Sequence, residues 1–220
     1  MIIGNGMLAN AMSIYKNDED ILIFASGISN SLETKQSEFD REFELLKTHA
    51  KTDKKFIYFS TISIFDPSLI ESQYIIHKRK IENYIRENCK SFIVFRLPIV
   101  VANSDNENTF FNYFKNKIKT RKYLEVKNNA YRYLIDIDDI VSEIPIFIKK
   151  FNNKVINIAF NNREKVYKII KNMEKILKSE AEKKIVYEKI SSNYLVDNYL
   201  FAKEKSYDNY NDTILKKYLN

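Results

Sequence analysis

The stretch Met1-Ile2-Ile3-Gly4-Asn5-Gly6-Met7-Leu8-Ala9 decides the fold, because it joins a short apolar segment to a helix through two glycines. Apolar residues then recur at helical spacing as far as Tyr15. In a Gly-x-Gly-x-x-Ala turn, the first glycine permits the tight bend, the second lets the backbone approach a phosphate, and the small third residue allows close helix packing. Since the chain has only 3 glycines, the two in this turn favour a phosphate site formed by Gly4, Asn5, Gly6, Met7 and Leu8. The alternative is an ordinary strand-to-helix turn that binds nothing.

Buried strands and charged helices alternate through residues 1–100. Continuous apolar runs at 21–25, 56–59 and 92–95 are typical of strands buried on both faces. Amphipathic segments at 33–51 and 70–89 lie between these runs and predict helices. Strand and helix in this order imply right-handed crossovers and a parallel sheet with helices on both faces. The expected fold class is therefore α/β, a Rossmann-like doubly wound parallel sheet.

The second half of the chain alternates less regularly. Helices are expected at 110–118, from the N-cap Asp138 to about residue 150, and at 166–177, with strands at 123–126 and 155–159. The charged, tyrosine-rich tail from Ser206 predicts a final surface helix. We expect residues 1–102 to form a cofactor-binding core. Residues 103–220 should supply the remaining core elements and a small substrate-binding lobe, all within one integrated domain.

One part of a full dinucleotide-binding half is missing after the first helix. Such a half usually places a carboxylate about 20 residues past the glycines, where it holds the adenosine ribose. Counting from Gly6 leads to residues 24–27, which contain no acid, while the acids at 18–20 precede the second strand. About ten residues separate the first helix from Ile21, too few for a further strand, helix and strand. We therefore predict a sheet shortened by the loss of the strands after the first helix.

A tyrosine and a lysine lie one helical turn apart in the second half of the predicted core. Tyr74 and Lys78 share one helix face, where the lysine can lower the pKa of the phenol from about 10 by stabilising the phenolate. The phenol can then act as general acid or base toward a carbonyl or alcohol, and Ser60 and Thr61 place a hydroxyl where it would meet the pair. As a bare pattern the pair is weak evidence, since the chain has 15 tyrosines and many lysines. His77 falls on a different helix face and is expected to be a surface bystander.

Six motifs occur in a fixed order over about residues 1–160. They are the glycine turn at Gly4; Ile23-Phe24-Ala25-Ser26-Gly27; Tyr58-Phe59-Ser60-Thr61-Ile62-Ser63-Ile64-Phe65-Asp66; Tyr74-x-x-x-Lys78-x-x-x-Glu82; Phe95-Arg96-Leu97-Pro98-Ile99-Val100; and Arg132-Tyr133-Leu134-Ile135-Asp136-Ile137-Asp138-Asp139. Together they resemble the extended short-chain dehydrogenase/reductase family, which contains nucleotide-sugar epimerases, dehydratases and 4-ketoreductases. Six ordered matches are far more specific than any one of them.

For the reaction, the resemblance implies three catalytic residues. Thr61 would hydrogen-bond the substrate oxygen, Tyr74 would transfer the proton, and Lys78 would hold the nicotinamide ribose and tune Tyr74. The chain departs from the family pattern in this region, because Thr61 and Tyr74 are only 13 residues apart where the family usually has a longer substrate loop. That departure bears on activity and leaves the expected fold unchanged.

For binding, the resemblance implies NAD or NADP as cofactor and a nucleotide-linked sugar as substrate. The turn from Gly4 to Leu8 would face the pyrophosphate, and Ala25 and Ser26 would lie beside the nicotinamide half. Arg132 would contact the diphosphate of the nucleotide sugar. Asn103 is the second expected substrate-binding residue, and with the alanine before it takes the place of the family's usual Gly-Pro. Because the strands next to adenosine are the ones predicted to be missing, we expect weak cofactor binding.

Composition excludes several other classes of protein. The net charge of +7 comes mostly from lysines spread along the chain, whereas nucleic-acid readers concentrate a basic stripe or an Arg-rich segment. No apolar run approaches the roughly 18–20 residues that span a bilayer. One cysteine excludes an intrachain disulfide framework, and with 2 histidines a Cys/His zinc site is implausible. We expect a cytoplasmic protein with no metal site, bound to neither nucleic acid nor membrane.

The hypothesis that these observations favour is an NAD(P)-dependent oxidoreductase or epimerase acting on a nucleotide-linked sugar in surface polysaccharide biosynthesis, with Tyr74 as proton donor or acceptor. The alternative is a catalytically inactive relative that binds a nucleotide or a partner protein through the same fold. Nucleic-acid binding through the lysine surface is a third, weaker alternative. A homodimer is compatible with either of the first two. The choices between epimerisation and reduction, between NAD and NADP, and among sugars stay open at this point.

Overall fold

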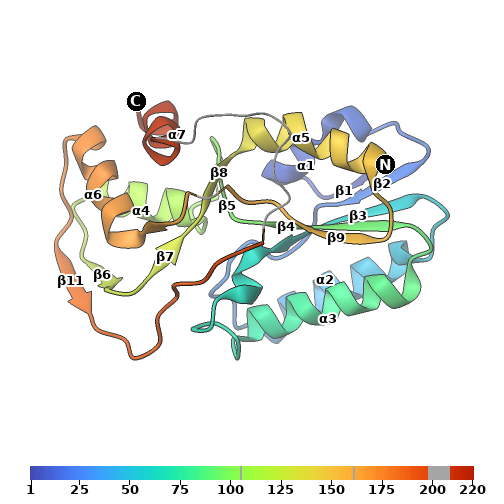
Figure 1. Cartoon of the computed structure of the whole chain (residues 1–220), viewed down its shortest axis with the longest axis horizontal. Coiled ribbons are helices and arrows are strands. Elements are labelled where there is room, and N and C mark those ends of the chain that lie inside the picture. The colour runs from blue at the N-terminus through green and yellow to red at the C-terminus, as the bar shows by residue number, and fades with distance from the viewer. Residues whose placement is uncertain (105, 161, 198–208) are drawn as a thin grey trace.

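A parallel sheet lies at the centre of the computed structural model, which describes residues 1–104, 106–160, 162–197 and 209–220. Its five strands lie in the order β1-β2-β3-β4-β9 (Figure 1). They are β1 (Ile2–Ile3), β2 (Ile21–Phe24), β3 (Lys55–Thr61), β4 (Phe92–Leu97) and β9 (Lys154–Asn157). A row of isoleucines crosses the sheet in register, from Ile2 through Ile23 and Ile57 to Ile93. The parallel Rossmann-like sheet that the apolar runs predicted is confirmed.

Helices cover both faces of this sheet. α2 (Gln36–Ala50) and α3 (Gln73–Asn88) lie on one face, and α1 (Met7–Ala11) and α5 (Ile137–Lys150) lie on the other (Figure 1). Successive residues of a strand point to opposite faces. Phe24 and Tyr58 therefore pack toward α2 and α3, whereas Ile23 and Ile57 pack toward α5. Continuous apolar strands thus build two buried layers, and burial of this kind drives the fold.

Within the described residues, β1 is an edge strand whose single neighbour is β2. A full dinucleotide-binding sheet has two further strands on the other side of its first strand. Here α1 has only 5 residues and leads through the 3₁₀ turn η1 (Ser13–Tyr15) directly to β2. The predicted loss of the strands after the first helix is confirmed.

The remaining elements form a second group beyond the carboxyl ends of the strands, which we call the lobe (Figure 1). It contains α4 (Phe110–Lys119), α6 (Val166–Leu177) and α7 (Tyr210–Leu219), which share a core that includes Phe111, Ile170 and Leu215. Three two-stranded sheets pair β5 (Ile99–Val101) with β8 (Leu134–Asp136), β6 (Leu124–Lys127) with β11 (Lys183–Val186), and β7 (Tyr131–Arg132) with β10 (Glu164–Lys165). None of the helices in the described ranges has the length and apolar content that crossing a bilayer requires.

The start of α5 differs from the expected cap. Asp136, and not the predicted Asp138, is the N-cap, because Asp136 still has extended backbone while Asp138 is already within the first turn and donates its amide to the Asp136 carboxylate. Asp136 also accepts a hydrogen bond from Tyr218 at 2.6 Å and pairs with Lys217 at 2.7 Å, both on α7. The predicted final helix is confirmed over Tyr210–Leu219, and its predicted start at Ser206 lies outside the described residues.

Candidate active site

The glycine turn lies at the edge of the sheet, between β1 and α1. Gly4 has φ +122°, which residues with a side chain rarely adopt, and a Cβ there would lie 2.5 Å from the carbonyl oxygen of Ala25. Gly4 therefore lets the turn pack directly against the end of β2. Gly6 is the N-cap of α1, and a Cβ at this position would meet no atom within 4 Å. Packing does not explain a glycine at position 6, whereas close approach of a ligand to the backbone does.

The amides expected to face a pyrophosphate begin at this turn. Asn5 is exposed, and Met7 and Leu8 are half-buried in the first turn of α1. The free N–H groups of a helix N-terminus attract phosphate, and the open space beside Gly6 fits the approach of a pyrophosphate to the backbone. The adenosine end fits less well, because no described strand lies beyond β1 to contact it. The turn is thus suited to the phosphates of a dinucleotide and offers little to its adenosine.

The residues after β2 connect the glycine turn to the interior of the site. The amide of Ala25 donates to the Ile3 carbonyl at 2.8 Å, which holds the two strand ends together. Ser26 accepts a hydrogen bond from the Arg41 guanidinium through Oγ at 3.4 Å. Gly27 comes next, and a Cβ there would lie 3.0 Å from Lys78 Nζ. The candidate cofactor residues at the ends of β1 and β2 are therefore brought together, and the loop after them reaches Lys78.

Thr61 and Tyr74 meet at the carboxyl end of β3. Thr61 is the last residue of β3, and its hydroxyl accepts a hydrogen bond from the amide of Ser63 in the 3₁₀ turn η2 (Ile62–Phe65). Tyr74 lies in the first turn of α3, and its phenol lies near the Thr61 side chain. Burial, together with the charge of Glu42, raises the pKa of Tyr74, and the nearby Thr61 hydroxyl offsets this only in part. The two hydroxyls predicted to act on a substrate oxygen are side by side.

Lys78 lies one turn further along α3, and only 2% of it is exposed. Its ammonium donates to Glu42 Oε1 at 2.9 Å and to the phenol oxygen of Tyr58 at 2.8 Å. Its Nζ atom lies 5.7 Å from the centre of the Tyr74 ring. The helix therefore brings Lys78 close to Tyr74, as their spacing predicted, but the lysine charge is paired with a carboxylate. Contact between Lys78 and a nicotinamide ribose stays a prediction.

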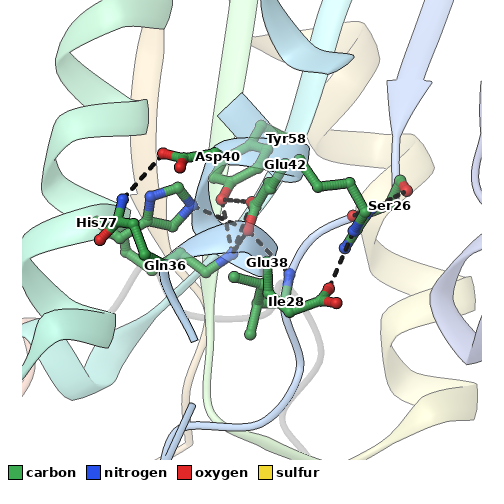
Figure 2. A network of polar contacts seen from close by, with 10 residues as sticks. Ser26, Ile28, Gln36, Glu38, Asp40, Glu42, Tyr58 and His77 are labelled. Atoms are coloured by element: carbon green, nitrogen blue, oxygen red, sulfur yellow. Dashed lines mark hydrogen bonds and ion pairs between the residues drawn. The ribbon is translucent and has the colours of Figure 1, made fainter. Parts of the chain in front are cut away.

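Glu42 is the centre of a buried polar network between α2, α3 and β3 (Figure 2). It is 0% exposed and accepts hydrogen bonds from the Tyr58 hydroxyl at 2.7 Å and from the Ile28 amide at 2.9 Å. Burial alone would raise the pKa of Glu42, but the Lys78 ammonium and the hydrogen bonds around the carboxylate hold that pKa well below its usual value. Glu42 is therefore ionised, and Lys78 is its counter-ion.

His77 also belongs to this network, so the expectation that it is a surface bystander is wrong. Its Nε2 lies 3.1 Å from Glu42 Oε2, and its ring contacts the Phe39 ring at a centroid distance of 4.9 Å. The expectation failed because α3 packs against α2 along a wide face, which includes His77 as well as Tyr74 and Lys78.

Sequence reasoning missed Glu42, although a signal was present. The buried residues of α2 are Phe39, Glu42, Leu46 and Ala50, which follow one face of the helix. A carboxylate on an otherwise apolar face indicates a buried charge that needs a partner. Tyr58 offered no comparable signal, because a tyrosine inside an apolar strand is ordinary core.

The two residues expected to bind substrate lie in different settings. Arg132, on β7, donates from Nη1 to Asp66 Oδ2 at 3.2 Å and to Ser192 Oγ at 3.3 Å. Asp66 follows the 3₁₀ turn after Thr61, so this ion pair joins the lobe to the end of β3. Asn103 is exposed and lies just after β5. Contact of either residue with a nucleotide sugar stays a prediction.

Neither a protein-family model nor a curated protein matches the sequence, but solved structures match the fold. A dTDP-4-dehydrorhamnose reductase from Clostridium acetobutylicum matches with a TM-score of 0.70 at 14% identity, over 96% of this chain and 84% of that one. A UDP-glucose 4-epimerase with UDP-glucose, from Thermotoga maritima, matches with a TM-score of 0.70 at 16% identity, over 97% and 80%. A dTDP-glucose 4,6-dehydratase from Bacillus anthracis, in complex with NAD, matches with a TM-score of 0.67 at 13% identity, over 97% and 76%.

These matches span nearly the whole chain and include enzymes of three different reactions. At such low identity the matches establish the fold only, and the reaction has to be argued from the residues of the site. The expectation drawn from the six ordered motifs is confirmed at this level: the chain has the Rossmann-type fold of the extended short-chain dehydrogenase/reductase enzymes.

Proposed function

We propose that the chain is an NAD(P)-dependent oxidoreductase or epimerase that acts on a nucleotide-linked sugar in the synthesis of a surface polysaccharide. The observation that carries this proposal is the closeness of the Thr61 and Tyr74 side chains at the carboxyl end of β3. This is the sheet edge at which doubly wound proteins bind their ligands, and the glycine turn lies at the same edge. The likeness in fold to a nucleotide-sugar reductase, epimerase and dehydratase supports the substrate class.

The reaction requires a proton transfer at the oxygen of the sugar carbon that reacts. Thr61 would hydrogen-bond that oxygen, and Tyr74 would give or take its proton as a positioned acid or base. Gly4 and Gly6 would let the backbone amides of the turn hold the pyrophosphate of the cofactor. When bound, the nicotinamide supplies the hydride chemistry, so this chain has to orient the sugar and move one proton.

Arg132 is the residue that we assign to the diphosphate of the sugar nucleotide. A guanidinium can hold a diphosphate with two parallel hydrogen bonds. Among the described residues, the hydrogen bonds of Arg132 all come from Nη1, which leaves Nε and Nη2 for a ligand. Its bond to Asp66 fixes the guanidinium near the end of β3, where the sugar would react.

A catalytically inactive protein that binds a nucleotide or a partner through the same fold is the second candidate. The pairing of Lys78 with Glu42 favours it, because a tyrosine that takes protons near neutral pH needs an unpaired positive charge beside it. In this site the pKa of Tyr74 is raised instead, chiefly by burial.

Binding and turnover measurements distinguish the two candidates. Thermal shift against NAD, NADP and UDP-, dTDP- and GDP-linked sugars reports binding, because a ligand stabilises the folded protein in proportion to occupancy. If the chain turns over, Tyr74→Phe should lower the rate by about 10²-fold or more, since it removes the positioned acid and keeps the ring. Tyr84→Phe is the matched control, because Tyr84 lies on the same helix and packs on Phe43. Unaltered turnover in Tyr74→Phe would favour the inactive candidate or another acid.

A further inference from the structure

The ion pair between Glu42 and Lys78 is closed off from water on several sides. The two residues are 0% and 2% exposed, and the loop after β2 covers them, since a Cβ at Gly27 would lie 3.0 Å from both charged groups. The Ile28 amide bonds the carboxylate, and the Tyr58 hydroxyl bonds both partners. Solvent ions therefore do not screen this pair as they screen charges at a surface.

Stability alone does not account for this arrangement. The cost of removing two charges from water offsets most of their attraction, and apolar side chains of similar volume hold helices together equally well. Leu46 of α2 and Ile81 of α3 belong to such an apolar layer beside the pair. The effect of the pair on its chemically active neighbour, Tyr74, offers a better reason.

The surroundings of Tyr74 favour a neutral phenol over a phenolate. The polar groups around it are Glu42 from α2, Tyr58 and Thr61 from β3, and His77 and Lys78 from α3 itself, while Ile28 and Ile64 make apolar contacts. The one cation in this set is Lys78, and its charge is balanced at 2.9 Å by Glu42. Burial and the Glu42 charge act in the same direction, and both raise the pKa of Tyr74.

Resting on the function proposed above, we propose that Glu42 is a positioning residue that binds Lys78 and so keeps Tyr74 a proton donor, which suits the site to reducing the carbonyl of a nucleotide-linked ketosugar. In this step the carbonyl carbon accepts a hydride from a reduced nicotinamide dinucleotide, and the carbonyl oxygen accepts the Tyr74 proton. The ketone becomes an alcohol, the nicotinamide is oxidised, and Tyr74 regains a proton from solvent. Oxidation or epimerisation of a sugar alcohol would have to start with a phenolate, which these surroundings disfavour.

The wild-type protein provides the first test, with two kinds of probe. With NADH or NADPH, we expect turnover of dTDP-4-keto-6-deoxyglucose or GDP-4-keto-6-deoxymannose at a rate that is level between about pH 6 and pH 9, because the phenol stays protonated over that range. With NAD or NADP, oxidation of UDP-glucose or dTDP-glucose should be at least about 10²-fold slower at neutral pH and should rise with pH. Alcohol turnover as fast as ketone turnover at neutral pH would overturn this inference and leave the proposed function standing. If the protein turns over neither kind of probe, both this inference and the proposed function are contradicted.

The variant Glu42→Gln provides the second test, because it keeps the size of the side chain and one acceptor oxygen and removes the charge. With Lys78 no longer neutralised, the pH at which alcohol oxidation begins to rise should fall by about one unit or more, and ketone reduction should start to decline at a lower pH. Glu44→Gln is the matched control, because Glu44 lies exposed on the same helix and should leave both profiles in place. A Glu42→Gln profile that coincides with the wild-type profile would show that Glu42 is structural only. If this variant fails to fold, the wild-type profiles still decide the question.

Discussion

The two ends of the candidate active site differ in how firmly the fold holds them. The glycine turn lies on an edge strand of 2 residues and opens a helix of 5 residues. The hydroxyls of Thr61 and Tyr74 lie between a strand of 7 residues and a helix of 16, above a buried network centred on Glu42. The part of the fold that would hold adenosine is therefore short, whereas the part that would hold the reacting oxygen consists of long elements and a buried polar network. Substitutions in the network should act first on stability, and substitutions at the turn should act first on binding.

The largest effect should follow from Lys78→Met. This change leaves the Glu42 carboxylate buried without its cation, which costs about 3–5 kcal/mol of unfolding free energy when one partner of a buried pair is removed. Urea unfolding measures the loss, with Lys80→Met, at an exposed position of the same helix, as the control. The double variant Glu42→Gln/Lys78→Met should recover much of the loss, because no unpaired charge remains. If the double variant is no more stable than Lys78→Met, the unpaired charge of Glu42 is not the cause of the lost stability.

The contrast between the two ends also explains what the sequence could predict. β2, β3 and β4 were predictable because a parallel strand buried on both faces is a continuous apolar run. The closeness of Thr61 and Tyr74 was predictable because Thr61 ends a strand of the sheet and Tyr74 lies at the start of the helix that follows it. Glu42 was missed because it lies among the charged residues Glu38, Asp40, Arg41 and Glu44, which are typical of a solvated helix. The packing of α3 and of the loop after β2 against α2 buries that one carboxylate, whereas Asp40, Arg41 and Glu44 stay exposed.

The lobe was predicted less well, for a different physical reason. Its strands are 2 to 4 residues long and pair with distant partners, as β7 does with β10 and β6 with β11. Short strands carry little periodicity, and their pairing depends on tertiary contacts that no local pattern records. Arg132 illustrates this, because its motif was readable while its ion pair with Asp66, 66 residues earlier, was not.

Arg132→Lys should give the next largest effect, on the substrate side of the comparison. Lysine keeps a charge for Asp66 but cannot reproduce two parallel hydrogen bonds to a diphosphate. Binding of UDP-, dTDP- or GDP-linked sugars should weaken by about 1.5–3 kcal/mol, while NAD and NADP affinities should not change. Calorimetric titration of both ligand classes measures this, with Arg121→Lys, at an exposed position after α4, as the control. Equal losses for sugar nucleotide and cofactor, or no loss for either, would remove Arg132 from the substrate site.

Substitutions at the two glycines of the turn should separate effects on stability from effects on cofactor binding. Gly4→Ala forces a side chain into a left-handed backbone conformation and against Ala25, so the unfolding free energy should fall by about 1–3 kcal/mol. Gly6→Ala adds a methyl group to open space, so stability should change by no more than about 0.5 kcal/mol while dinucleotide binding weakens. Urea unfolding and cofactor titration of both variants provide the comparison. Gly6→Ala with unchanged cofactor affinity would indicate an ordinary strand-to-helix turn.

The smallest effect concerns the choice between NAD and NADP. The two cofactors differ by a phosphate on the adenosine ribose, and no described strand lies beyond β1 to contact that ribose. A phosphate that stays in solvent interacts with surface lysines by less than about 1 kcal/mol, so the two dissociation constants should agree within roughly fivefold. Both should be above about 1 μM, because loss of one charge-assisted adenosine contact costs about 1.5–3 kcal/mol. Calorimetry at two protein concentrations, with the oligomeric state followed by light scattering, also shows whether a homodimer restores affinity. A sub-micromolar dissociation constant for the monomer, or a preference well above tenfold for either cofactor, would mean that other residues of the chain bind the adenosine. The contrast between a weakly held adenosine end and a firmly held reacting end would then no longer hold.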